Sequence, residues 1–420
     1  MTTSAPNLVQ TGDNGVPGSP EAEPTAEEMI ARARSLRPRL RELQEHHTAL
    51  GTYSQEIHEA FAKLRLYDIL RPKRYGGLEL GLETFFRVVT EIARADPGVG
   101  WSFELGASHA YQFSSFFPER AQEEAFRSAP FVSASRTFAL KSEVERVEGG
   151  WRVSGRWDYA SGCTWSTHFM PTGTFIDEDG TRTELMFIVP RSDFEIQDDW
   201  GGDATIGMSA SSSNSIEIHD AFVPEYNAVV YNFKDYEWGT DGTPGYRLHG
   251  NPMYLGRTLT FFIAGLVVTQ TGAALAALDE YERLLERNSS FPPRVPRVES
   301  PEYQMWYGQI MSAAEAATEL HLASVRSLEQ RYAAWAAGGP EVTVEDDARL
   351  RGQVLQAGKL AEQAVSIAFS TAGTSSAGKA GARLGKYYRD CAMYRTHIGS
   401  QYDMLFASQA RVALGQPLTM

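Results

Sequence analysis

The stretch Gly385-Lys-Tyr-Tyr-Arg-Asp-Cys-Ala-Met-Tyr-Arg-Thr-His-Ile-Gly-Ser400 lies in the last helical region of the chain. It places an Arg389-Asp390 pair ahead of His397, and Gly399-Ser400 closes it. Imidazole titrates near neutral pH, so His397 is a candidate to supply a proton or a hydrogen bond. We expect Asp390 to pair with an arginine and to position the helix, and we expect His397 to lie within that helix.

Three further helical patterns precede this stretch. Leu259 to Leu285 is apolar and rich in alanine, and residues 300–337 and 344–373 follow it. Long helices in series with broad apolar faces are typical of a bundle that is buried further by oligomerisation. We therefore expect a C-terminal helical bundle over residues 241–420.

The pattern changes twice on the N-terminal side of the bundle. Within residues 131–240, stretches such as Trp151–Tyr159 alternate apolar and polar residues, which predicts a β domain. Residues 25–130 have apolar residues at helical spacing and form an N-terminal helical domain. Residues 1–24 are rich in Pro, Gly, Ser, Thr and Glu, which predicts a disordered tail. The order predicts an α+β fold.

Composition excludes several classes of protein. The 420 residues carry a net charge of −14, which argues against nucleic acid or an anionic membrane as partner. Two cysteines, Cys163 and Cys391, suit reduced thiols in a cytoplasmic protein. We identify no signal peptide, no apolar run of membrane-spanning length, no cluster with metal-ligand spacing and no phosphate or dinucleotide-binding loop.

Several local motifs, in this order, resemble the acyl-CoA dehydrogenase fold, with an N-terminal helical domain, a middle β-barrel or sandwich and a C-terminal four-helix bundle. They are Arg71-Pro-Lys-Arg-Tyr-Gly-Gly77, Gly155-Arg-Trp-Asp-Tyr-Ala-Ser-Gly162, Phe222-Val-Pro-Glu225, Leu285-Glu-Arg-Asn-Ser-Ser-Phe291 and Tyr388-Arg-Asp390.

One departure from that family bears on function. The resemblance puts Ile398 where acyl-CoA dehydrogenases carry a glutamate base, and Leu259 at their alternative base position. Neither side chain accepts a proton. An acyl-CoA dehydrogenase-like oxidoreductase with an unplaced base stays an alternative, as does a flavin-binding paralogue without catalysis.

The chain is more similar to the oxygenase components of two-component flavin monooxygenases of the 4-hydroxyphenylacetate hydroxylase type. The resemblance implies a homotetramer that takes reduced FMN, or alternatively FAD, from a separate NAD(P)H:flavin reductase. With O2 it would form a flavin C4a-hydroperoxide that hydroxylates a small aromatic, phenolic or natural-product substrate. N- or S-oxygenation of an amino sugar or a thiophene is an alternative on the same fold.

The resemblance also implies the residues around the flavin. His109, Ser135, Ser161 and His397 match the positions that surround the ring, and Ser133 is the rival of Ser135. Ser161 is expected to bond near the flavin N5, His397 to assist the peroxide, and His109 to deprotonate a phenol.

Four further positions follow from the same resemblance. Tyr159 lies in the strand beside the ring, whereas Arg287, Gly373 and Thr374 are expected to approach the flavin of a neighbouring subunit. Ser211 and Ser213 are weaker candidates for flavin contact. His168 and His321 are interpreted as structural.

Overall fold

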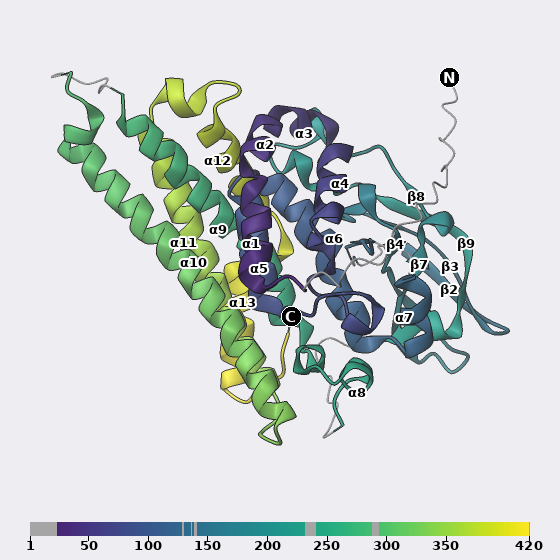
Figure 1. Ribbon diagram of the computed structural model, residues 1–420. Helices are drawn as coiled ribbons and strands as arrows, with labels where there is room; N and C mark the ends of the chain where they lie inside the picture. The colour runs from purple at the N-terminus through teal and green to yellow at the C-terminus, as the bar shows by residue number, and fades with distance from the viewer. Residues whose placement is uncertain are drawn as a thin grey trace, which may run out of the picture.

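The computed structural model describes residues 23–127, 130–135, 137, 141–231, 241–287 and 294–419. The long helices of the C-terminal half lie side by side on one side of the molecule, and the strands lie on the other, with the N-terminal helices between them (Figure 1). The α+β fold is confirmed. The expected tail falls almost wholly outside the described residues, as does the end of the Leu285–Phe291 motif.

The N-terminal region is helical. Its helices are α1 (Ala26–Ser35), α2 (Arg37–Glu42), α3 (Gln44–Leu50), α4 (Gln55–Lys63), α5 (Leu82–Ala93), α6 (Pro97–Phe116) and α7 (Glu119–Ala125). Helix α1 starts at a capping box in which Thr25 and Glu28 bond each other's backbone. Helix α6 starts at Asp96, which accepts from the backbone N–H of Gly98 and Val99.

Helix α6 is buried on every side, from its first residue to its last. A helix without a polar face is stable only inside a core. Its sequence allows this, because small residues bring the neighbouring helices close. A Cβ at Gly100 would lie 2.6 Å from the Cβ of Ala93 in α5, which leaves room only for glycine. Residues of α6 therefore face the interior on several sides at once.

The described part of the middle region contains ten strands in three sheets. The strands are β1 (Ser133–Ala134), β2 (Lys141–Val147), β3 (Gly150–Trp157), β4 (His168–Phe169), β5 (Thr172–Ile176), β6 (Arg182–Phe187), β7 (Val189–Pro190), β8 (Glu195–Ile196), β9 (Ile216–Pro224) and β10 (Ala228–Val230). The sheet orders are β1-β4-β7, β10-β6-β5 and β2-β3-β9-β8. Strands β5 and β6 are antiparallel neighbours, and residues 177–181 form the turn between them.

The C-terminal region consists of α8 (Pro244–His249), α9 (Thr258–Leu285), α10 (Pro301–Ala336), α11 (Val344–Thr371), α12 (Arg383–Tyr394) and α13 (Tyr402–Ala413). The expectation that His397 lies within the last helix is wrong. This residue follows α12 and begins a single 3-10 turn, Ile398–Ser400, ahead of α13.

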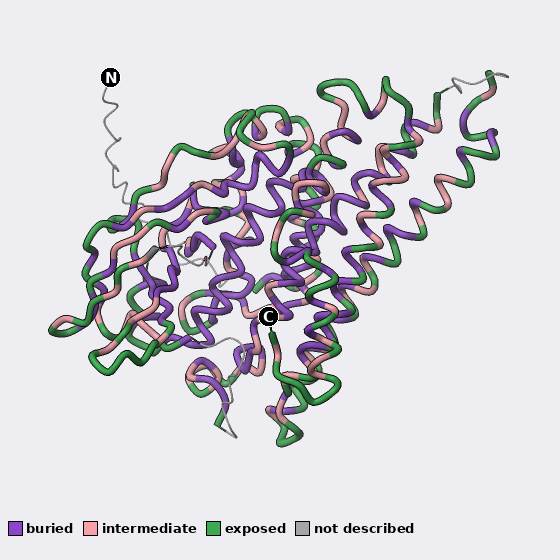
Figure 2. The backbone as a smooth tube through the Cα atoms, turned by 180° about the vertical axis from the view of Figure 1, so that it is seen from behind, coloured by how far each residue is buried: buried purple, intermediate pink, exposed green. Residues whose placement is uncertain are grey.

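Helix α9 corrects the expectation that no apolar run reaches membrane-spanning length. Among the described helices it is long and apolar enough by length and composition, with 28 residues, but 89% of its most apolar window is buried inside the protein. On the helical side of the molecule, buried backbone runs through the middle and exposed residues follow the outer edge (Figure 2). We interpret α9 as a core helix.

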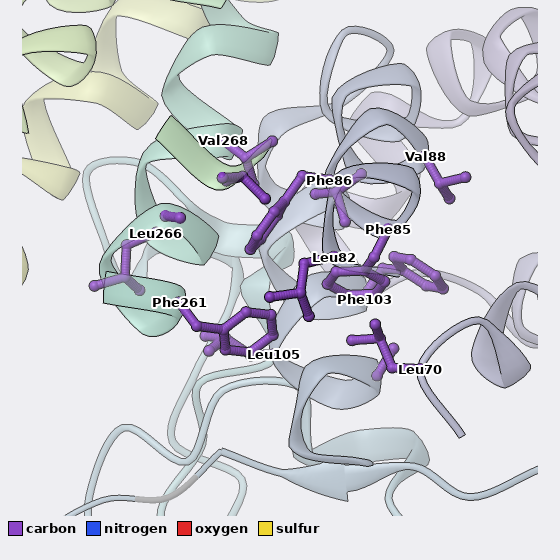
Figure 3. Close-up of a cluster of buried hydrophobic side chains, with 14 of the residues drawn as sticks. Leu70, Leu82, Phe85, Phe86, Val88, Phe103, Leu105, Phe261, Leu266 and Val268 are labelled. Carbon is purple, nitrogen blue, oxygen red and sulfur yellow. The ribbon is translucent and has the colours of Figure 1, made fainter. Parts of the chain in front are cut away.

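The main core joins α5, α6 and α9. Phe86 of α5 lies against Phe261 of α9, with ring centroids 5.3 Å apart, and Phe103 and Leu105 of α6 belong to the same cluster (Figure 3). Burying such side chains stabilises the fold by about 1.5–3 kcal/mol each. This core fixes α6 against α9 and so positions the side chains that α6 presents to the β region.

Candidate active site

Ser161 is placed by a tight turn at the end of the strand motif. Its backbone N–H donates to the carbonyl of Tyr159 at 2.8 Å, and its carbonyl accepts from the N–H of Ser135 at 3.0 Å. The indole Nε1–H of Trp101, on α6, donates to the Ser161 hydroxyl oxygen at 3.0 Å. The turn brings Ser135 and Ser161 together as expected, and α6 adds a tryptophan that the sequence did not single out.

The hydroxyls of two further serines form a row with that of Ser161. Its Oγ lies 2.6 Å from Oγ of Ser213, which lies 2.6 Å from Oγ of Ser211. The backbone explains the approach, because the Gly162 N–H donates to the carbonyl of Ser211 at 3.1 Å. Gly162 has a φ of 76°, and a Cβ there would lie 2.8 Å from the carbonyl of Ser102. We define Ser161, Ser213 and Ser211 as the hydroxyl chain.

Tyr159 presents an aromatic ring at the edge of this cluster. Its φ of 60° is in the left-handed region, which is strained for a tyrosine. The side chain is 64% exposed, and its ring lies edge-on to that of Trp200. Ser135 Oγ donates to the Tyr159 carbonyl at 3.4 Å, whereas Ser133 Oγ donates to the neighbouring carbonyl of Ala134. Ser135 is therefore the serine that lies beside Ser161.

His397 faces the same cluster from the C-terminal side. Its Nδ1 accepts from the Gly399 N–H at 2.9 Å, and its ring lies edge-on to Trp101 with centroids 5.4 Å apart. Burial lowers the pKa of His397 to about 4, so the ring is neutral near pH 7. Since Nδ1 accepts, Nε2 carries the proton. Ile398 is 62% exposed, so the histidine and not the isoleucine faces inward.

His109 lies on α6, about two turns beyond Trp101. It is 1% exposed, its Nδ1–H donates to the Leu105 carbonyl at 2.7 Å, and its ring lies 5.3 Å from that of Phe262 in α9. Nδ1 is therefore the ring nitrogen that carries the proton in the neutral form. At 1.5 Å per residue, His109 stands about 12 Å from Trp101 along the helix.

A half-buried lysine joins the start of α6 to α12. Lys386 Nζ lies 2.8 Å from Oδ1 of Asp96 and 2.8 Å from Oδ2 of Asp390. Burial opposes its charge, but the two carboxylates outweigh burial and raise the pKa of Lys386. Asp390 Oδ1 accepts from the Met208 N–H at 2.7 Å. The expectation that Asp390 pairs with an arginine is therefore wrong, because Lys386, one turn earlier, is the cation within reach.

Arg287, Gly373 and Thr374 lie elsewhere in the chain. All three are exposed at one end of the bundle, where the Tyr281 hydroxyl lies 2.9 Å from that of Thr371. Helix geometry places the end of α9 at Leu285, two residues before Arg287, about 33 Å from Ile263, which contacts the Gly399 turn. The structure does not bring them to Ser161 in one chain, and their contact with a neighbouring subunit stays a prediction.

His168 and His321 are held by other parts of the structure. His321 Nε2 donates to the Ala264 carbonyl at 2.8 Å, and His168 Nδ1 lies 3.0 Å from the hydroxyl of Thr167.

Sequence reasoning missed Trp101 and Lys386 and gave Ser213 little weight. The i, i+4, i+8 spacing of Trp101, Leu105 and His109 was the signal for Trp101.

Comparison with known proteins fits this architecture. Residues 24–126 match the acyl-CoA dehydrogenase N-terminal domain, and residues 264–402 match the acyl-CoA dehydrogenase C-terminal domain. The chain is 31% identical over 357 residues to a pigment production hydroxylase of Rhodococcus sp. (strain ATCC 21145), covering 83% of this chain and 87% of that one. It is 24% identical over 397 residues to the flavin-dependent monooxygenase oxygenase subunit HsaA of Mycobacterium tuberculosis (strain ATCC 25618 / H37Rv), covering 93% and 96%.

The chain belongs to the flavin-dependent monooxygenases of the acyl-CoA dehydrogenase fold. The structure of XiaF from Streptomyces sp. in complex with FADH2 and glycerol superposes on this monooxygenase with a TM-score of 0.84, 22% identity, and coverage of 94% of this chain and 97% of that one. The expected fold and family are confirmed.

The family implies a flavin, and the residues of this monooxygenase fit one. Tyr159 offers an exposed aromatic face, and Ser161 and Ser135 supply hydroxyls beside it. Trp101, His397 and the side chains of Ile263 and Leu266 around Gly399 are neutral and mostly apolar. A flat, neutral ring with a hydrogen-bonding edge suits such surroundings.

Proposed function

We propose that this chain is the oxygenase component of a two-component monooxygenase that hydroxylates a small aromatic or phenolic substrate. The observation that carries the proposal is the convergence of Ser161, Trp101 and His397 on one apolar site next to the exposed ring of Tyr159. A bound reduced flavin would supply the reaction with O2.

Each residue has a role in the proposal. Tyr159 and the Ser161 turn hold and orient the flavin ring, while Trp101 fixes the Ser161 hydroxyl. His397 acts as a neutral hydrogen-bond donor through Nε2, because its lowered pKa leaves little imidazolium near pH 7. His109, on the same helix and next to Phe262, accepts the phenolic proton through Nε2.

The dehydrogenase alternative needs a carboxylate base, and Glu104 is the carboxylate that α6 carries between Trp101 and His109. It is 1% exposed and packs against Gly265 of α9, where a Cβ would collide with its Oε1. Burial raises the pKa of Glu104 to about 8, so it is mostly protonated at neutral pH. Because a protonated acid does not remove an α-proton, the monooxygenase hypothesis is favoured.

The proposal extends to the assembly. The enzyme receives reduced FMN or FAD from a separate NAD(P)H:flavin reductase and works in the cytoplasm. It forms a homotetramer in which Arg287, Gly373 and Thr374 contact the flavin of a neighbouring subunit. The exposure of these three residues on one end of the bundle supports this arrangement.

The test supplies the purified chain with chemically reduced FMN or FAD, oxygen and a panel of phenols, in the absence of any reductase. We expect hydroxylated product with one of the two flavins, and no reaction of acyl-CoA substrates with an electron acceptor. Formation of hydrogen peroxide alone with every phenol, together with acyl-CoA oxidation, contradicts the proposal.

A further inference from the structure

The hydroxyl chain offers one more proton than its internal hydrogen bonds use. Three hydroxyl protons are shared between two Oγ–Oγ contacts of 2.6 Å each. The Trp101 indole has only a hydrogen to give, so Ser161 Oγ always accepts from it. The direction of the other two bonds is free to change, because a serine hydroxyl rotates without moving its oxygen.

The hydroxyl chain therefore has two polarities, that is, two directions in which its hydroxyls can donate. When Ser211 donates to Ser213 and Ser213 donates to Ser161, both lone pairs of Ser161 are occupied and its proton points outward. When Ser161 instead donates to Ser213 and Ser213 donates to Ser211, the spare proton is that of Ser211, and one lone pair of Ser161 is open and accepts a hydrogen. Toward a bound ligand, the Ser161 hydroxyl is thus a donor in one polarity and an acceptor in the other.

We propose that Ser213 is a positioning residue that lets Ser161 either donate to or accept from the same flavin nitrogen. This inference rests on the proposed function, in which Ser161 faces N5. An oxidised isoalloxazine has a bare nitrogen at N5, which accepts, whereas the reduced ring has an N–H there, which donates. Reversal of the hydroxyl chain matches Ser161 to both forms with no movement of heavy atoms.

Because the hydroxyl chain is buried, the direction of its hydrogen bonds should affect flavin affinity. Ser161 and Ser213 are each 5% exposed and Ser211 is 1% exposed. In Ser213→Ala, a Ser161 that accepts from the reduced ring has no partner left for its own proton. A buried polar hydrogen without a partner is penalised by about a factor of ten or more in binding. A Ser161 that donates to the oxidised ring keeps a partner for its proton and loses only one accepted hydrogen bond.

The experiment measures dissociation constants of oxidised and anaerobically reduced flavin for the wild type, Ser213→Ala, Ser213→Thr and Ser115→Ala. The Ser115→Ala control removes an equally buried hydroxyl that bonds the Tyr111 carbonyl within α6. We expect Ser213→Ala to weaken binding of reduced flavin about tenfold and of oxidised flavin less than twofold. Ser213→Thr keeps the hydroxyl and should restore binding, and Ser211→Ala should act in the same direction as Ser213→Ala.

A second readout does not depend on turnover. A tenfold loss for the reduced form alone lowers the two-electron midpoint potential of the bound flavin by about 30 mV. Equal weakening of both redox forms, or an unchanged potential in Ser213→Ala, overturns the role of Ser213 and leaves the proposed function standing. A wild type that binds neither form overturns the proposed function and this inference together.

Discussion

The indole of Trp101 lies edge-on to the imidazole of His397, with the ring centroids 5.4 Å apart and the planes at 78°. The same indole donates to Ser161. One side chain of α6 therefore contacts both the β-region serine and the C-terminal histidine. This contact links segments that are far apart in the sequence and makes Trp101 the centre of the candidate site.

Trp101→Phe tests that role, because it removes the Nε1–H and keeps an aromatic ring. We expect a loss of about 1 kcal/mol in the free energy of unfolding, with a clear rise in hydrogen peroxide released per product. Trp165→Phe is the matched control, since Trp165 Nε1–H donates to the Tyr53 carbonyl at 3.0 Å. The control should lose similar stability without a change in peroxide release. Equal peroxide release by both variants contradicts the central role of Trp101.

His397→Ala should still bind flavin within about twofold of the wild type. The ratio of product to hydrogen peroxide should fall about tenfold, because one hydrogen bond of ~1.4 kcal/mol is lost. Ile398→Ala, at a side chain that is 62% exposed, should leave that ratio unchanged. If the alanine at position 398 has the larger effect, the assignment of the inward-facing residue is wrong.

The pH dependence of the wild type sharpens this test. The pKa of His397 is lowered to about 4, so its protonation should not affect the product ratio between about pH 6 and pH 8.

Sequence alone could predict many residues of this site, but it could not predict the ion pairs and side-chain contacts between distant segments. The motif around Ser161 and the exchange at Ile398 were readable because each depends on local spacing. The partner of Asp390 was not, since a charge pair depends on which side chains the fold brings close. Trp101 was missed because α6 has no polar face, so its burial pattern does not distinguish a core residue from a site residue.

Glu104→Gln should stabilise the protein at alkaline pH. The folded pKa of about 8 lies above the usual value, so the native state binds a proton that the unfolded chain releases. Stability from this group is therefore complete below about pH 4.5 and falls as pH rises towards 8. The amide needs no proton, and we expect a gain of about 1–3 kcal/mol at pH 8 that shrinks towards pH 5, measured by denaturant unfolding. Destabilisation at every pH would show that Glu104 is ionised and paired.

Lys386→Met should be strongly destabilising, because it leaves Asp96 and Asp390 buried without their shared cation. Breaking a buried ion pair costs about 3–5 kcal/mol. The control is Lys379→Met, at an exposed lysine before α12, which should change stability by less than about 0.5 kcal/mol. Unfolding by urea measures both, and similar stabilities for the two variants would mean that the carboxylates do not depend on Lys386.

The ion pairs of Lys386 also bear on the order in which the protein folds. Lys386 bonds a residue 290 positions earlier in the chain, and Asp390 bonds the Met208 backbone 182 positions earlier. A ribosome has made most of the chain before either contact can form. Contacts this distant in sequence slow folding and prolong exposure of apolar surface. Assembly of the site is therefore a late event, completed only once the last helices have emerged.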